Sequence, residues 1–218
     1  MNNRPLFPIL VCLCALAAAS PYASAQRFEF HPYAGYFNAD KFTLGELKTD
    51  GIYGAKGGIF LTDSLEAELN FGYINHFKFV GTNARTRGLA WEAAGAYNFG
   101  ERTLGGARLR PFVSLGLGGI TAHLGDGKVA VSTSRHTIFL EDPFLGITRP
   151  FTSVQTVAIH SGDTFFAVSY GGGVKALQLK GPLGVRGEIR GRTMPNFFGS
   201  TTNWIEGSGG LTFTWGER

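Results

Sequence analysis

Ser208-Gly-Gly-Leu-Thr-Phe-Thr-Trp215, almost at the end of the sequence, is the stretch that decides the fold. Leu211, Phe213 and Trp215 alternate with two threonines. Side chains of a β-strand point alternately to opposite faces, so this pattern predicts a strand with one apolar, aromatic-ended face and one small, polar face. Many soluble sheets alternate in the same way, so the rest of the chain has to decide where such a strand belongs.

Residues 1–25 have the three parts of a secretory signal peptide. Arg4 supplies the positive start, residues 6–19 form an apolar core, and Ala23-Ser-Ala25 matches a cleavage site. The apolar core is too short for a membrane-spanning helix. We therefore predict a cleaved signal peptide, 1–25, followed by one mature domain, 26–218.

The composition of the mature part narrows the class of protein. Cys12 and Cys14 both lie in the predicted signal peptide, so disulfides, thiolate catalysis and cysteine metal sites are excluded from the mature chain. All 32 glycines follow residue 25, and glycine disfavours helices. No later apolar run is long enough for a membrane helix, so a mature chain that crosses a bilayer must form a closed barrel. The formal net charge of the whole sequence is +4, and without Arg4 that of the mature part is +3, which is too small to indicate nucleic-acid binding.

Eight segments have the composition and pattern of strands. They cover approximately residues 28–37, 51–62, 64–78, 88–99, 110–123, 164–177, 183–193 and 204–215. The connections alternate between short turns and mostly longer loops, of which the loop at about 124–163 is the longest. This asymmetry is typical of membrane barrels, whose short turns face the periplasm and whose long loops face outward.

Each predicted strand separates apolar from charged side chains. In 64–78, Leu65, Leu69 and Phe71 share one face, while Glu66 and Glu68 share the other. A soluble barrel would turn the apolar face inward, and a membrane barrel would turn it toward lipid. The charged faces carry acids and bases in near balance, and buried charges are tolerable when they pair, so we predict a lumen ion network. Its members are Lys56, Glu66, Glu68, Lys78, Glu92, Lys175, Arg186, Glu188, Arg190, Arg192 and Glu206.

Small and aromatic residues support the same orientation. Glycines on the inner face leave room for long charged side chains in a narrow eight-stranded lumen. Aromatic side chains near the strand ends are expected to form two girdles at the membrane interfaces. The expected girdle residues are Phe28, Phe30, Tyr53, Phe77, Phe79, Trp91, Phe99, Trp204 and Trp215.

With these features the chain resembles the OmpA-type family of eight-stranded bacterial outer-membrane β-barrels. The resemblance covers residues 26–215 and includes the glycine-rich segments 110–119 and 170–175. It implies that the last strand is also a signal to the barrel-insertion machinery. The residues that match the signal pattern are Ser208, Gly210, Phe213 and Trp215, with Gly216-Glu-Arg218 following where the family usually ends on the aromatic residue.

The sequence shows no compact catalytic or metal-binding group. A serine hydrolase needs a nucleophile beside a base and an acid that orients the base, and no such grouping stands out around the five histidines. His76 and His123 are both expected near the outer rim, which leaves a lipid A deacylase-like hydrolase as an alternative. No two histidines have metal-ligand spacing. We predict no catalytic residue, cofactor or metal.

The sequence thus predicts an all-β, antiparallel, up-and-down transmembrane barrel in the Gram-negative outer membrane. Its expected role is non-enzymatic, either structural or in surface interaction, with a plugged lumen. Expected partners are outer-membrane lipids, the insertion machinery and an extracellular protein or surface ligand, with no nucleic acid. In the loop at 124–163, Val129–Val131 and Thr137–Leu140 are candidate hairpin strands. A second alternative is a secreted soluble barrel that binds an apolar ligand.

Overall fold

A computed structural model shows a closed barrel and a separate hairpin. It describes residues 27–39, 41–42, 45–46, 50–75, 86–104, 107–124, 129–141, 148–197 and 200–216. The eight strands of the barrel are β1 (Phe28–Ala39), β4 (Asp50–Phe60), β5 (Leu65–Ile74), β6 (Thr86–Asn98), β8 (Ala107–Leu124), β11 (Thr164–Lys180), β12 (Leu183–Phe197) and β13 (Ser200–Trp215). The shorter or separate strands are β2 (Lys41–Phe42), β3 (Gly45–Glu46), β7 (Arg102–Leu104), β9 (Val129–Glu141) and β10 (Thr148–His160).

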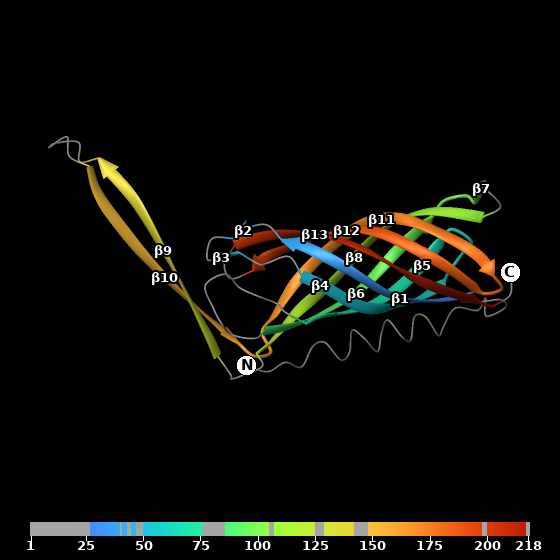
Figure 1. Ribbon diagram of the computed structural model, residues 1–218, viewed down its shortest axis with the longest axis horizontal. Coiled ribbons are helices and arrows are strands. Elements are labelled where there is room, and N and C mark those ends of the chain that lie inside the picture. The colour runs from blue at the N-terminus through green and yellow to red at the C-terminus, as the bar shows by residue number, and fades with distance from the viewer. Residues whose placement is uncertain are drawn as a thin grey trace.

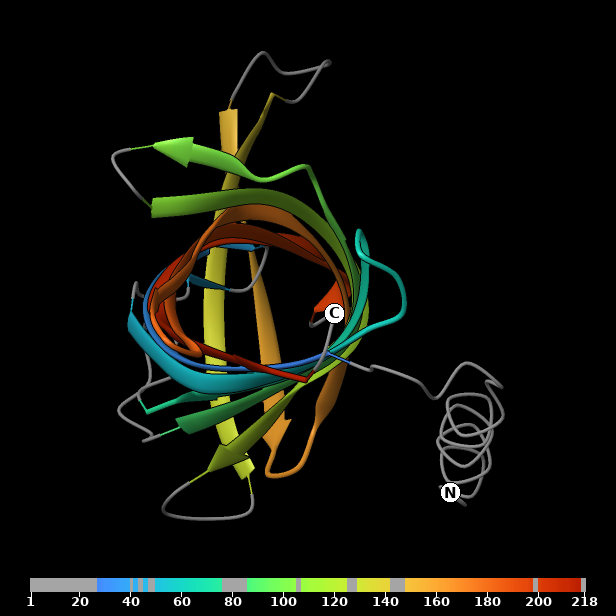
Figure 2. The same cartoon turned by 90° about the vertical axis from the view of Figure 1, so that its right-hand side faces the viewer.

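Each barrel strand pairs antiparallel with its neighbour in the chain, and two further pairings complete the ring. β8 pairs with β11 across the long insertion, and β13 pairs with β1, with Trp215 opposite Phe28. Figure 2 looks along the barrel and shows this ring of strands. The structure therefore confirms the predicted eight-stranded, antiparallel, up-and-down barrel. Within the described residues there is no helix long and apolar enough to cross a membrane.

The two ends of the barrel differ. At one end, which we call the turn end, lie the connections 61–64 and 181–182, the start of β1 and the end of β13. Gly181 has φ 63° there, a conformation that favours glycine. The opposite end, the loop end, carries the β2–β3 and β9–β10 hairpins (Figure 1).

Two connections differ from their expected form. β12 and β13 are longer than the predicted strands 183–193 and 204–215, because β12 continues to Phe197 and β13 begins at Ser200. In the long loop, β9 and β10 pair over their full lengths, from Val129 opposite His160 to Glu141 opposite Thr148. Pro150 lies within β10 and does not end it. The hairpin extends away from the barrel in Figure 1.

Candidate functional site

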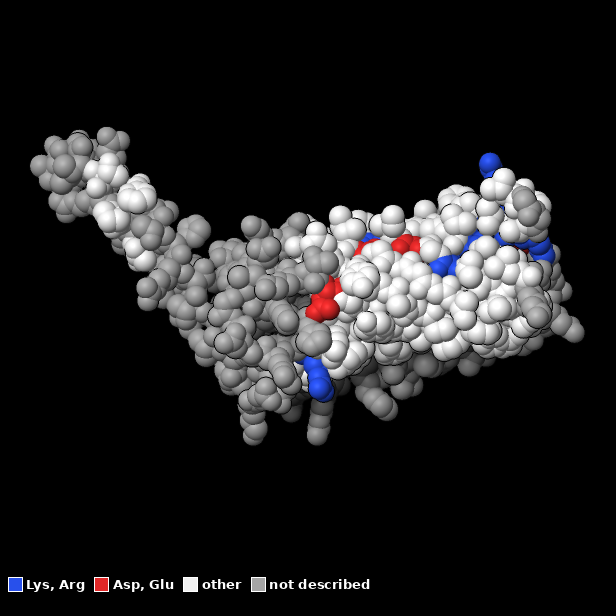
Figure 3. All heavy atoms as spheres, viewed as in Figure 1, with Lys and Arg blue, Asp and Glu red and all other residues white. Residues whose placement is uncertain are grey.

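The inner face of the barrel follows directly from strand alternation. In β5, burial alternates at every residue from Leu65 to Ile74. Leu69 and Phe71 are 54% and 56% exposed, whereas Glu68 is only 3% exposed. The flank of the barrel is mostly uncharged in Figure 3. The predicted orientation, with apolar side chains outside and charges inside, is therefore confirmed.

Lys175 organises the charges nearest the turn end. Its Nζ donates to Glu66 Oε2 at 2.7 Å and to Glu29 Oε2 at 3.0 Å. The same oxygen of Glu66 accepts from Asn98 Nδ2 at 3.0 Å. The ring of Phe112 lies 5.3 Å from the ammonium, at cation–π distance. One buried cation thus holds carboxylates from two strands, β1 and β5.

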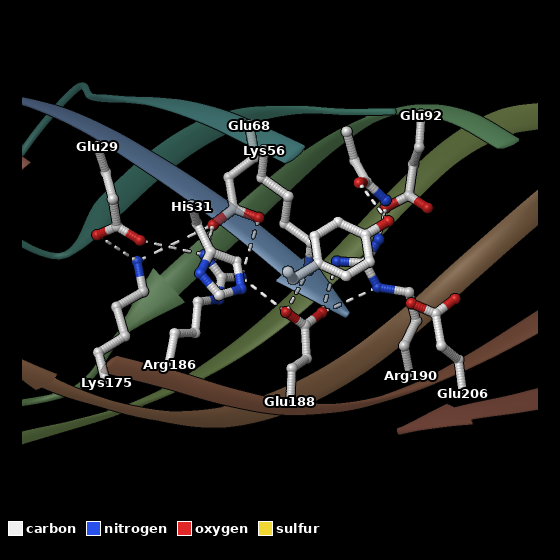
Figure 4. Close-up of polar contacts among 12 residues, drawn as sticks. Glu29, His31, Lys56, Glu68, Glu92, Lys175, Arg186, Glu188, Arg190 and Glu206 are labelled. Atoms are coloured by element: carbon white, nitrogen blue, oxygen red, sulfur yellow. Dashed lines mark hydrogen bonds and ion pairs between the residues drawn. The ribbon is translucent and has the colours of Figure 1, made fainter. Parts of the chain in front are cut away.

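Arg186 lies at the centre of the network. Its terminal nitrogens donate to both oxygens of Glu68 at 2.6 and 3.1 Å. They also donate to Glu29 at 3.3 Å and to Glu188 at 2.9 Å. Lys56 donates to the same oxygen of Glu188, Oε2, that accepts from Arg186. Figure 4 shows these side chains meeting in the lumen from several strands.

The network continues toward the loop end through two more arginines. Arg190 donates from Nε to Glu188 at 2.9 Å and from Nη1 to Glu92 at 2.6 Å. Arg192 pairs with Glu206 and approaches the other oxygen of Glu92 at 3.3 Å. All five side chains are at most 6% exposed. The charges therefore form a continuous chain of alternating acids and bases along the lumen, which is how buried charge is tolerated.

Glycines make room for this chain of charges. A Cβ at Gly58 would lie 2.1 Å from Glu66 Oε1, and one at Gly116 would lie 2.8 Å from Glu92 Oε1. Both contacts are too short for real atoms. These carboxylate oxygens therefore lie in the space that a β-carbon at either position would take.

The structure places the predicted network residues as follows. Ten of them lie on the inner face and form ion pairs with one another or with Glu29: Lys56, Glu66, Glu68, Glu92, Lys175, Arg186, Glu188, Arg190, Arg192 and Glu206. Lys78 lies outside the described residues. Sequence reasoning missed Glu29, although its position between Phe28 and Phe30 carries the same alternation signal.

Toward the loop end the lumen becomes apolar. Phe37 and Trp204 pack with ring centroids 4.8 Å apart, and both are about 1% exposed. The cluster around them, here named the apolar plug, comprises Tyr33, Phe37, Ile52, Ile74, Ala90, Ile120, Ala122, Ala167, Met194, Phe197 and Trp204. The expectation that Trp204 belongs to an interfacial girdle is therefore wrong. β13 continues outward past the network, and its alternation turns Trp204 inward beside Glu206.

Three carboxylates in the lumen lie close enough together to suggest a metal site. Ligand oxygens of Glu29, Glu66 and Glu68 lie within 4.8 Å of one another. However, the Lys175 ammonium lies 3.0, 2.7 and 3.9 Å from these three groups in turn. The lysine thus takes the position that a cation would need, and the cluster is part of the ion network.

Two of the described histidines, His31 and His160, make polar contacts within the fold. His31 is buried and its Nδ1 lies 2.7 Å from the Leu211 carbonyl oxygen. His160 Nδ1 lies 3.7 Å from Asp163 Oδ2 in the exposed turn after β10. His123 is exposed, and its expected neighbour His76 lies outside the described residues.

Gly210 lies in β13, the last strand, which closes the barrel by pairing with β1. Gly210 lies opposite Tyr33 of β1, and a Cβ there would lie 2.0 Å from the Pro32 carbonyl oxygen. Trp215 is 51% exposed and stacks on Phe28 at 6.4 Å between centroids. Ser208 lies opposite Gly35, and Phe213 lies opposite Phe30. Gly210 therefore allows the first and last strands to approach closely.

Several solved outer-membrane barrels are similar to this chain, and the one with a TM-score above 0.5 has the same fold. Neisserial surface protein A (NspA) matches with a TM-score of 0.54 and 13% identity, over 85% of this chain and 96% of that chain. The outer membrane protein OprG from Pseudomonas aeruginosa matches with a TM-score of 0.48 and 9% identity, over 88% and 96%. The N-terminal β-barrel domain of Pseudomonas aeruginosa OprF matches with a TM-score of 0.46 and 19% identity, over 88% and 100%.

Comparison at the sequence level points the same way. No curated protein matches the chain. The sequence model of one family, described as the outer membrane protein beta-barrel domain, matches residues 9–204. With that match over most of its length, and with the barrel and the resemblance to OmpA-type proteins described above, this chain belongs to the outer membrane β-barrel family.

Proposed function

We propose that this chain is a non-enzymatic protein of the bacterial outer membrane, with a sealed lumen and a surface that faces the cell exterior. In this proposal the turn end faces the periplasm and the loop end faces outward. The short turns at one end and the long hairpin at the other support that orientation. Residues 1–25 would direct export and be removed.

The observation that carries the proposal is the filling of the lumen along its length. The ion network occupies the part nearer the turn end, and the apolar plug occupies the part nearer the loop end. Lys175, Arg190 and Trp204, which span this length, are all 1% exposed or less. Such an interior has no continuous water-filled path for ions, which supports a role in surface interaction and not in transport.

Conductance tests this proposal directly. The purified protein, inserted into planar bilayers, is expected to give no steady channels. A double variant that opens both layers, Arg190→Ala with Trp204→Ala, is expected to leak more than the native chain. Large, steady channels from the native protein would contradict the sealed lumen.

The β9–β10 hairpin is the surface that we assign to interaction with an extracellular protein or ligand. Each strand has 13 residues, so the hairpin extends about 43 Å. Phe139 is 71% exposed on it, and two-stranded sheets leave backbone donors and acceptors on both outer edges. Such edges pair readily with an extended strand of a partner.

Single cysteines can test the orientation, because both native cysteines lie in the predicted signal peptide. Thr152→Cys on the hairpin should react with a membrane-impermeant maleimide on intact cells. Thr62→Cys in a turn-end connection should react only after the outer membrane is permeabilised. The reverse pattern would overturn the proposed orientation, and equal labelling would argue against an outer-membrane location.

The export step has its own test. The N-terminus of the protein recovered from outer-membrane fractions is expected to be Gln26. Heat-modifiable migration on a gel should accompany it. Recovery of the protein in the soluble fraction, without detergent, would favour the secreted soluble barrel, although that alternative requires the apolar face to point inward and the observed Leu69 and Phe71 point outward.

A further inference from the structure

A cavity of about 110 Å³ opens at the turn end of the lumen, beyond the last charges of the ion network. Arg27, Arg110 and Lys175 bring three cations to its wall, and Phe60, Leu177 and Thr214 complete most of the remainder. By volume it has room for several water molecules or for one ion of phosphate size. The proposed function, which depends on a sealed lumen, does not use this cavity.

Arg110 is one of the cations that line the cavity. It is only 8% exposed, and its Nη2 donates to Glu101 at 2.6 Å while its Nη1 lies 3.4 Å from the Asp63 carbonyl oxygen. Its Nε is buried and has no hydrogen-bond partner among the described residues. A guanidinium group can only donate, so this N–H requires an acceptor from outside the described chain.

A second residue of the lining also has a buried polar atom without a hydrogen-bond partner. Thr214 Oγ1 is buried and has no partner within the described part of the chain. A hydroxyl group donates as readily as it accepts. Two residues that line the cavity, Arg110 of β8 and Thr214 of β13, therefore each carry a buried polar atom with no partner among the described residues.

The charges around the cavity favour an anion. Glu29 is the carboxylate on the wall, and its two oxygens already accept from Lys175 at 3.0 Å and from Arg186 at 3.3 Å. The guanidinium carbon of Arg27 lies 3.7 Å from the centroid of the Phe60 ring, which holds this cation beside the opening. Figure 3 shows basic side chains at the end of the barrel where β7 lies. The lining residues thus carry three positive charges and one negative charge, and Lys175 and Arg110 are also paired with Glu66 and Glu101.

We propose that this cavity binds a small oxyanion, a phosphate or carboxylate group, with Arg110 Nε and Thr214 Oγ1 as donors and with Arg27 and Lys175 supplying positive charge. Charge-assisted hydrogen bonds from arginine are short and strong, and the fork of the guanidinium group matches oxyanion geometry. The group could be free in solution or part of a lipid headgroup, and the two sources share this chemistry.

The first experiment is a calorimetric titration of inorganic phosphate into the folded protein in neutral-detergent micelles. Saturable binding with one site per chain is expected. Arg110→Gln should weaken it at least tenfold, and Thr214→Val, which removes a donor without changing charge, should weaken it about two- to fivefold. Arg102→Gln provides the matched control, because Arg102 is exposed on β7 and does not line the cavity. Heat-modifiable migration checks that each variant is folded.

The outcomes separate clearly. Absence of saturable binding by the native chain, or equal binding by the native, Arg110→Gln and Thr214→Val chains, would overturn the proposal. Repeating the titration in nanodiscs identifies the source of the group. If phosphatidylglycerol weakens phosphate binding relative to phosphatidylcholine alone, the headgroup competes for the site, whereas an unchanged affinity assigns the site to a soluble anion. Failure of this site would leave conductance and labelling results, and with them the proposed function, unaffected.

Discussion

Arg186 of β12 and Glu68 of β5 form a two-pronged ion pair across the lumen, with Nη1–Oε1 and Nη2–Oε2 distances of 2.6 and 3.1 Å. The two residues are 118 positions apart in the chain. Neither strand is a neighbour of the other in the ring. The pair therefore ties opposite walls of the barrel together through side chains alone.

Removing one member of this pair should be costly. In Arg186→Met, Glu68 loses its main partner while staying buried, and the free energy of unfolding should fall by about 3–5 kcal/mol. Urea unfolding in phosphatidylcholine vesicles measures this. The double variant Glu68→Gln with Arg186→Met leaves no such unpaired charge at this position and should recover part of the loss. A single variant as stable as the native protein would show that the pair contributes nothing.

Two glycines on neighbouring strands make a matched test of the crowded interior. A Cβ at Gly118 would lie 2.0 Å from the Trp91 carbonyl oxygen, so Gly118→Ala requires the backbone to shift and should lower stability by about 1–3 kcal/mol. Gly95 is exposed and has no atom within 4 Å of its Cβ position, so Gly95→Ala should change stability by no more than about 0.5 kcal/mol. Unfolding curves of the two variants, collected side by side, give the comparison. Equal effects would contradict the inward placement of Gly118.

The lipid-facing surface can be tested with a charge. Leu69 is 54% exposed on β5, and Leu69→Arg should lower stability in vesicles by about 2–4 kcal/mol if the position lies near the middle of the bilayer. Leu104 is 70% exposed on β7, beside the barrel at the turn end, where we expect water, and Leu104→Arg should have little effect. A harmless Leu69→Arg variant would mean that this face does not meet hydrocarbon.

Trp204 and Trp215 should respond differently to their surroundings. Each is studied in a chain where the other two tryptophans are replaced by phenylalanine. Fluorescence of Trp215, which is 51% exposed, should be quenched by brominated lipids, and that of Trp204, in the apolar plug, should be shielded. Trp204→Ala should also lower stability by about 3–5 kcal/mol, because it leaves a cavity against Phe37. Strong quenching of Trp204 would return it to the girdle that the sequence predicts.

Sequence alternation was enough to predict the fold and most of the inner face. The period of two assigns Glu68 and Leu69 to opposite sides regardless of what surrounds them, and β5 has that arrangement. Which side is the interior followed from the near balance of acids and bases on the charged face, since unpaired charge cannot be buried. Glu29 carried the same signal between two phenylalanines and was overlooked.

Other features depend on three-dimensional relations that one sequence does not contain. The inward position of Trp204 depends on how far β13 continues toward the loop end, and strand ends are poorly marked in sequence. The pairing of Lys175 with Glu29 and Glu66 depends on the lateral offset of strands around the ring, which no single strand encodes. The cavity beside Arg110 depends on side chains from several strands meeting at one end.

The unequal distribution of charge among the strands constrains how the molecule can assemble. β12 contributes Arg186, Arg190 and Arg192, while their main carboxylate partners outside that strand come from β5, β6 and β13. An isolated β12 would bring three arginines and only one carboxylate, Glu188, into the hydrocarbon of the bilayer, which is strongly unfavourable. We therefore expect β12 to enter the bilayer together with the strands that carry its partners, the earlier β5 and β6 and the following β13, and not before them.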